Sequence, residues 1–164
     1  MKTYRHIPLI ALACLTLLIC SCESQYFHDY NVKNETSLSI KLRMFIGKDS
    51  TDVSMTAGQE QKLKEYTDQT NDIDTERIVT LYDSIYVYND AGTIFIMKWN
   101  KEADLYKDLN YANFFYQGDW QYELNNTSTV FSLKDEDINI YRTENGLPTI
   151  QDVINKVNEG DGTK

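Results

Sequence analysis

Two stretches of strand-like sequence constrain the fold of this chain more than any other feature. In residues 37–46, SLSIKLRMFI, apolar side chains occupy every second position: Leu38, Ile40, Leu42, Met44 and Ile46. A period of two places alternate side chains on opposite faces of a strand, so this segment is predicted to be a half-buried strand. Residues 77–99 are rich in Ile, Val, Tyr, Thr and Phe, which are enriched in strands.

Turn signals divide the rest of the chain into short strands. The sequence Asn89-Asp90-Ala91-Gly92 predicts a tight hairpin between strands 85–88 and 93–99. Further strands are expected at 51–55, around Gly118 in 111–124, and within 128–142, where an acidic turn and an extended segment end the stretch. Many short strands separated by turns predict one antiparallel β-sandwich of about seven strands, with a partly open barrel as the alternative.

The last segment changes its period and is predicted to be a helix over residues 149–158. Its apolar side chains are spaced as on one helical face: Ile150, Val153, Ile154 and Val157. Thr149 is a suitable N-cap, and Gly160 is expected just past the end. An apolar face of this kind must pack on the sheet or on its edge.

The first residues read as an export signal. Lys2 and Arg5 precede an apolar run from Ile7 to Cys20, which is too short to span a bilayer. The chain has three cysteines, and all of them lie within this region or directly after it: Cys14, Cys20 and Cys22. Polar, acidic sequence follows at once, as it does after a cleavage site.

The end of this signal resembles the lipobox of bacterial lipoproteins. Ile19 fits the aliphatic position, Ser21 the small position, and Cys22 the cysteine that receives the lipid. The resemblance implies a signal peptide at 1–21, a lipidated N-terminus and tether at 22–31, and a β-sandwich domain at 32–164. The implied partner is a membrane, reached through the lipid on Cys22, because two or more acyl chains anchor a protein stably.

Several segments are similar to the small β-sandwich lipoproteins of the Bacteroides group, whose functions are mostly unassigned. They are the lipobox, VKNETSLSIKLRMF at 32–45, DSIYVYNDAGTI at 83–94, and YELNNTSTVFSLKDEDI at 122–138. The resemblance implies an Ig-like body anchored at the outer membrane, and it supplies no catalytic residues. Asp49-Ser50-Thr51 and Asp83-Ser84-Ile85 resemble the O-glycosylation motif of that group, so Ser50 and Ser84 are candidate glycosylation sites.

Composition argues against several classes of function. The formal net charge of −9 disfavours nucleic acid and anionic lipid as partners. Once the signal is removed, His28, expected to be solvated in the tether, is the remaining histidine, so a His-based triad or a two-His metal site cannot be built in one chain. No glycine-rich phosphate loop is present, and we expect no cofactor. The acidic stretches 72–76 and 135–137 are expected to be solvated loops rather than calcium or other metal sites.

Aromatic residues give the best candidate for a binding surface. Ile85 and Val87 are expected to face the core, so the alternation turns Tyr82, Tyr86 and Tyr88 outward. Tyr and Trp are enriched at interfaces, and Trp120 is the next candidate. The alternative is that these rings fill the core, and the C-terminal helix is expected to cover part of the row.

The sequence thus predicts a non-catalytic binding or structural lipoprotein of the cell envelope, lipid-anchored, on the surface or the periplasmic face of the outer membrane. Its partner would be a glycan or an envelope protein. One alternative is a periplasm-facing accessory lipoprotein of an envelope complex. A second, weaker alternative is a hydrolase that acts through carboxylates alone, because any acidic chain supplies pairs of carboxylates.

Overall fold

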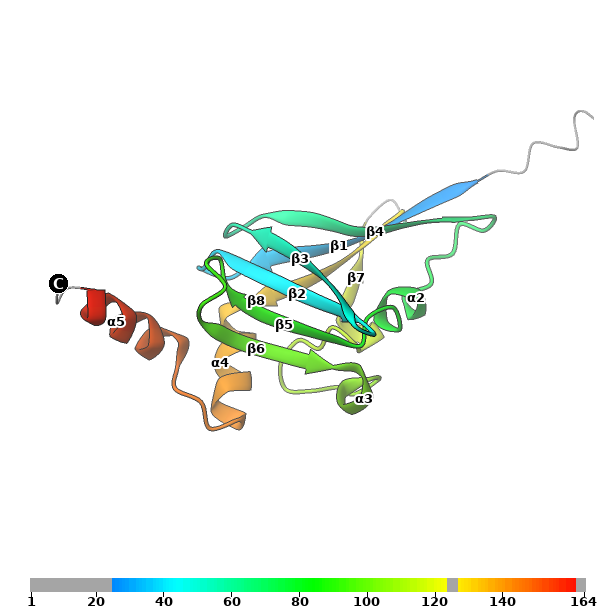
Figure 1. Cartoon of the computed structure of the whole chain (residues 1–164). Coiled ribbons are helices and arrows are strands. Elements are labelled where there is room, and N and C mark those ends of the chain that lie inside the picture. Colours follow the sequence, from blue (N-terminus) through cyan, green and yellow to red (C-terminus); the bar gives the residue numbers. More distant parts are fainter. Residues whose placement is uncertain (1–24, 124–126, 162–164) are drawn as a thin grey trace, which may run out of the picture.

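The computed structural model describes residues 25–123 and 127–161, which form two stacked sheets of four strands each (Figure 1). The first sheet has the order β4-β1-β8-β7, and the second has the order β3-β2-β5-β6. The strands are β1 (Tyr26–Glu35), β2 (Ile40–Ile46), β3 (Asp49–Met55), β4 (Glu60–Asp68), β5 (Ser84–Asn89), β6 (Phe95–Asn100), β7 (Trp120–Tyr122) and β8 (Ser128–Lys134). The predicted mainly β, sandwich-like architecture is therefore confirmed.

The second sheet follows the sequence pattern closely. Ile40, Leu42 and Met44 of β2 are buried, while the intervening side chains are partly exposed, as a period of two requires. All neighbours in this sheet are antiparallel. The predicted hairpin joins β5 to β6: the Asn89 side-chain oxygen accepts hydrogen bonds from the backbone N–H of Thr93 and Ile94 at 2.8 Å. Gly92 adopts φ +72°, which favours glycine in this turn.

The first sheet departs from the antiparallel expectation. β1 pairs in parallel with β8, from Asp29 opposite Ser128 to Glu35 opposite Lys134. Parallel pairing needs a long crossover connection, and here almost the whole chain lies between the two strands. No local turn signal in the sequence therefore predicts that they pair.

Two segments for which the sequence predicts no strand belong to the first sheet. β1 begins at Tyr26, within the segment predicted as a tether, and β4 occupies residues that show little periodicity. His28 is correspondingly buried rather than solvated, and its Nε2 lies 3.1 Å from the Thr70 carbonyl oxygen. Pairing with neighbours orders both strands even though their own pattern is weak.

Aromatic side chains fill the space between the sheets. Trp99 of β6 and Phe131 of β8 meet edge to face, with ring centroids 5.5 Å apart. Phe114, from the loop after β6, contacts both of these rings and Trp120. Tyr30 of β1 packs edge to face on Trp120. Such pairs add to the stability gained from burying apolar area.

Short helices close the open sides of the sandwich: α2 (Glu76–Val79), α3 (Lys101–Asp104), the 3-10 turn η1 (Gln117–Asp119), α4 (Asp135–Glu144) and α5 (Ile150–Asp161). α4 corrects the prediction of an acidic turn followed by extended chain. Asp135, Glu136 and Asp137 form its first turn, where the helix dipole favours negative charge, and Asp137 accepts the backbone N–H of Lys134 at 2.9 Å. Ile138 and Tyr141, three residues apart, face the core.

The predicted C-terminal helix is confirmed as α5. The Thr149 hydroxyl oxygen accepts the backbone N–H of Asp152 at 3.2 Å, as an N-cap does. The helix continues to Asp161, so Gly160 does not lie past its end. Ile150 and Ile154 line a cavity of about 260 Å³ with residues at the hairpin end of the second sheet: Leu38, Ser39, Asn89, Ile94 and Ile96.

Candidate functional site

Four aromatic side chains gather on the outer face of the second sheet. Strand register brings them together: Arg43 lies opposite Tyr86, Lys41 opposite Tyr88, and Tyr88 opposite Phe95. Phe45, Tyr86, Tyr88 and Phe95 form what we call the aromatic face, and all four are partly exposed. In Figure 1 the strands β2, β5 and β6 form the nearer layer, and no helix is laid across their front.

A β-bulge in β6 turns Phe95 outward. Val87 pairs with Met97, but its neighbour Tyr88 pairs with Phe95, so Ile96 is an extra residue in β6. Ile96 and Met97 are consequently both buried, while Phe95 and Lys98 both face outward. An unbroken alternation would have buried Phe95, which is why the sequence pattern alone does not place it on this face.

The flat faces of the two tyrosine rings are already engaged. Tyr86 and Tyr88 lie nearly parallel, with centroids 6.4 Å apart and planes 12° apart. The Arg43 guanidinium carbon lies 5.7 Å from the centroid of Tyr88, and the Lys98 Nζ lies 5.9 Å from that of Tyr86. Phe45 and Phe95 meet these rings edge to face. A ligand therefore meets ring edges, which carry partial positive charge, more than open ring faces.

The polar groups on this face are mainly donors. Among the described residues, neither the Tyr86 nor the Tyr88 hydroxyl has a hydrogen-bond partner, and both side chains are partly exposed. Arg43 is paired with Asp52, with Nε 2.8 Å from Oδ1. Lys41 and Lys98 have no carboxylate within ion-pair distance in the part of the chain that the structure describes. The centre of the face is thus positive in a chain of net charge −9.

Two of the four predicted surface aromatics are buried instead. Tyr82 precedes β5 rather than belonging to it, and its ring packs on Phe114 in the core. Trp120 is buried between Tyr30, Phe114 and Phe131, and its Nε1 donates to the Phe114 carbonyl oxygen at 2.9 Å. The prediction of a surface position is therefore wrong for these two residues. Tyr86 and Tyr88 are partly exposed and lie on the side of β5 opposite to the buried Ile85 and Val87.

The two candidate glycosylation residues border the same face. Phe45 pairs with Ser50 of β3 on one side and with Ser84 of β5 on the other. Ser50 is exposed and Ser84 is partly exposed. The strand register thus brings together two motifs that are far apart in the sequence.

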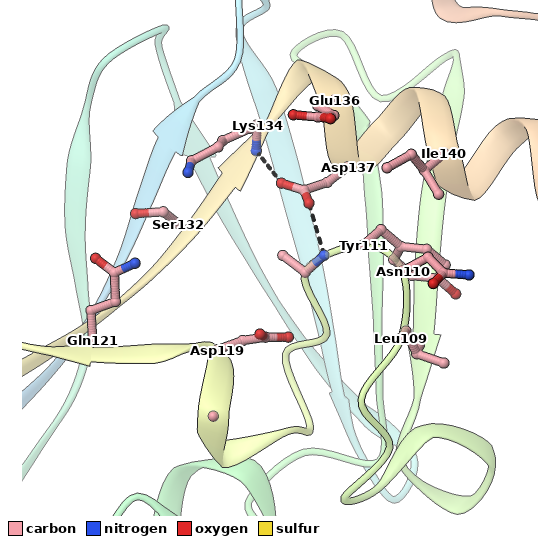
Figure 2. Close-up of a pocket in the computed structure, with 12 residues that line it drawn as sticks. Leu109, Asn110, Tyr111, Asp119, Gln121, Ser132, Lys134, Glu136, Asp137 and Ile140 are labelled. Atoms are coloured by element: carbon pink, nitrogen blue, oxygen red, sulfur yellow. Dashed lines mark hydrogen bonds between the residues drawn. The ribbon is translucent and has the colours of Figure 1, made fainter.

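A second, polar pocket opens on the other sheet, with a volume of about 360 Å³ (Figure 2). Gln121, Ser132 and Lys134 contribute from the outer side of β7 and β8, and Glu136, Asp137 and Ile140 from α4. The remaining wall is the loop before β7, with Leu109, Asn110, Tyr111, Ala112, Gly118 and Asp119.

The carboxylates of this pocket are largely occupied in holding the fold. Asp137 accepts the backbone N–H of Ala112 at 2.8 Å and that of Lys134 at 2.9 Å, as Figure 2 shows. Asp119 accepts the backbone N–H of Asn113 at 2.7 Å. Burial raises the pKa of Asp119, and the nearby Asp108 and Asp137 carboxylates raise it further. The contact between Asp137 and Ala112 ties the loop to α4.

The acidic stretches that could suggest calcium also have structural partners. Asp74 accepts the backbone N–H of Glu76 and lies 3.6 Å from Arg77, while Asp135 accepts the backbone N–H and hydroxyl of Ser37. Within residues 25–123 and 127–161, no group of three or more His, Cys, Asp or Glu side chains is arranged to hold a metal ion.

Comparison of this chain with protein-family models, curated proteins and solved structures gives no significant match. Cys22 and the predicted signal lie outside the described residues. Among the described helices, none is long and apolar enough to cross a membrane.

Proposed function

We propose that this protein is a lipid-anchored lipoprotein of the bacterial cell envelope that binds an acidic glycan through its aromatic face. The lipobox-like residues ending at Cys22 support the anchor. The two stacked four-stranded sheets support an Ig-like assignment of the body, with the parallel β1–β8 pair as a variation. The binding role is non-catalytic.

One observation carries the binding role. The aromatic face combines partly exposed ring edges, two tyrosine hydroxyls and two unpaired lysine ammonium groups on an uncovered sheet. Ring edges, hydroxyls and ammonium groups all favour electron-rich oxygen, so a polymer of hydroxyls and carboxylates complements them. The core of a protein interface is usually depleted of lysine, which favours a glycan over a protein partner.

The test uses polygalacturonate and its methyl-esterified form, which share a backbone and differ in charge. Binding of both polymers to the full-length protein in detergent is measured by microscale thermophoresis. We expect the acidic polymer to bind more tightly at low salt. Tyr86→Ala should weaken binding of the acidic polymer by at least about tenfold. Lys98→Gln should weaken it by about threefold at low salt, and at high salt this variant should bind as the parent does.

Lys64→Gln is the matched control, because Lys64 Nζ also lies 5.7 Å from a tyrosine centroid, that of Tyr66 on β4. This variant should bind as the parent does. Equal binding of both polymers would contradict the proposal that the ligand is acidic. Binding that Tyr86→Ala leaves unchanged, or cross-linking of this face to an envelope protein with no glycan binding, would overturn the proposed glycan role.

A further inference from the structure

The start of β1 fixes how far the body can lie from a lipid on Cys22. The strand begins at Tyr26, so four Cα–Cα steps separate it from Cys22. Four steps of extended chain span at most about 14 Å. That is no more than about two to three times the thickness of the headgroup region of a bilayer, about 5–8 Å on each side. With Cys22 acylated, the first residues of β1 must therefore lie at or close to the membrane surface.

The strand topology defines which side of the sandwich this is. β1 ends where β2 begins after a short connection, so the end of β2 lies on the same side as the start of β1. β5 begins opposite the end of β2, with Ser84 paired to Phe45. β8 runs parallel to β1, and Tyr122 at the end of β7 pairs with Thr129 near the start of β8. These strand ends form one side, which we call the β1-start end.

Large exposed apolar side chains concentrate at the β1-start end. Among the described residues, five such side chains have exposed fractions of 36% to 57%: Tyr26, Phe27, Ile46, Tyr106 and Tyr122. Ile46 ends β2, Tyr122 ends β7, and Tyr106 is hydrogen-bonded to Glu76 at the start of α2. All five thus lie at the end from which the chain leads back to Cys22, and exposed apolar side chains gathered on one side of a protein mark an interaction surface.

Tyr26 and Phe27 extend furthest. They pair only with β4, opposite Asp68 and Thr67, whereas the pairing of β1 with β8 begins at Asp29. Figure 1 shows this two-stranded ribbon projecting beyond the rest of the sandwich. Arg77 and Lys101 near this end are paired with Asp68 and Asp83, and the neighbouring exposed Lys48, in the β2–β3 turn, and Asp49, at the start of β3, carry opposite charges. The exposed apolar side chains, rather than a net positive charge, therefore favour the membrane here.

We infer that the β1-start end rests on the bilayer, with Tyr26 and Phe27 inserted in the headgroup region and the aromatic face held roughly perpendicular to it. Amphipathic aromatic side chains favour this region of the bilayer. The inference rests on the proposed acylation of Cys22. It identifies the bilayer as the partner of this apolar patch. It also predicts that the sandwich has a fixed orientation on the membrane and does not move freely on a flexible tether.

The test measures the depth of single indole probes in the full-length acylated protein. Phe27→Trp places a probe at the β1-start end, and Ala91→Trp places one in the β5–β6 hairpin at the opposite end. The native Trp99 and Trp120 are buried and give a constant background. In phosphatidylcholine vesicles with brominated acyl chains, we expect quenching and a blue shift of the F27W emission. The A91W emission should not change.

Mass spectrometry of the same samples distinguishes the two levels of the proposal. An acylated Cys22 with no quenching of F27W would overturn the orientation and leave the anchor in place. Equal quenching of both probes would also overturn it, since the body would then lie flat. A Cys22 without acyl chains would remove the anchor and the orientation together. Circular dichroism of each variant confirms that the probe has not disturbed the fold.

Discussion

Arg142 of α4 holds the bulge at Phe95 of β6. Its Nη1 donates to the carbonyl oxygens of Phe95 at 2.9 Å and Ile96 at 2.8 Å, and its Nε donates to the Pro148 carbonyl oxygen at 2.5 Å. The side chain is buried, and burial lowers its pKa. A single guanidinium thus connects α4, the loop before α5 and the edge strand that carries part of the aromatic face.

Replacement of Arg142 by Met should lower the free energy of unfolding by about 2–4 kcal/mol, because three carbonyl oxygens lose their donor in a buried site. Urea unfolding followed by tryptophan fluorescence measures the change. Lys98→Met, at an exposed position of β6, should change stability by no more than about 0.5 kcal/mol. Similar values for the two variants would show that the carbonyl contacts of Arg142 contribute little.

Asp119 should give a distinctive pH dependence. Burial raises its pKa, so the folded state binds its proton more tightly than the unfolded chain does. The free energy of unfolding contributed by this group therefore falls as pH rises through the folded-state pKa. Asp119→Asn should be more stable than the parent at pH 7, and the difference should shrink toward pH 4, near the ordinary pKa of Asp.

Asp52→Asn is the control, and its effect on stability at pH 7 should be opposite to that of Asp119→Asn. The hydrogen bond from Arg43 lowers the pKa of Asp52, so this carboxylate stabilises the fold above its ordinary pKa, and its loss should destabilise at pH 7. Urea titrations between pH 4 and pH 8 compare both variants with the parent. Parallel pH profiles for the two variants would contradict the assigned environments.

Gly118 packs closely against the ring of Tyr116 in the turn before β7. A Cβ at this position would lie 2.5 Å from the Tyr116 ring. Gly118→Ala should cost about 1–3 kcal/mol of stability. Tyr116→Ala in the same chain should recover most of that cost, since it removes the ring that clashes. If the stability losses of the two single variants simply add in the double variant, contact with the Tyr116 ring is not the source of the cost.

Cys22 should determine membrane attachment. Cys22→Ala is expected to leave the protein unprocessed or to release it from the membrane fraction, because no acyl chain can then be attached. Cys20→Ala should still be processed and anchored. Fractionation and intact mass measure both outcomes, and the reverse pattern would move the lipidation site to Cys20.

Ser50 should carry more glycan than Ser84, because its hydroxyl lies on an exposed edge strand and that of Ser84 is only partly exposed. Intact-mass analysis of native material measures the added sugar. Ser50→Ala should lose most of it, and Ser84→Ala should lose less. Since both residues flank Phe45, a glycan at either site would border the aromatic face. Unmodified native protein would contradict this prediction.

Part of the candidate site can be predicted from the sequence. The alternation around Ile85 and Val87 places Tyr86 and Tyr88 outward, and the same logic applied to β2 places Lys41, Arg43 and Phe45 outward. The alternation does not apply to Tyr82, which is buried, because β5 begins after this residue. Phe95 escapes it because the bulge shifts the alternation by one residue.

The helix α4 shows a different limit of sequence patterns. Ile138 and Ile140 alternate as in a strand, while Ile138 and Tyr141 are spaced as on a helix, so a short window fits both. The acidic run 135–137 directly before them is the signal that favours a helix start. Burial of Ile138 and Tyr141 against the sandwich then stabilises the helical alternative.

The sequence by itself determined the features that depend on near neighbours in the chain: the alternating strands β2 and β5, the Asn89–Gly92 hairpin and the capped helix α5. Tertiary structure alone decided the parallel pairing of β1 with β8, the strand identity of β1 and β4, and the burial of Tyr82 and Trp120. Dihedral preferences and turn chemistry act over a few residues and can be read locally. Strand pairing and burial depend on partners far along the chain, and a single sequence does not reveal which ones they are.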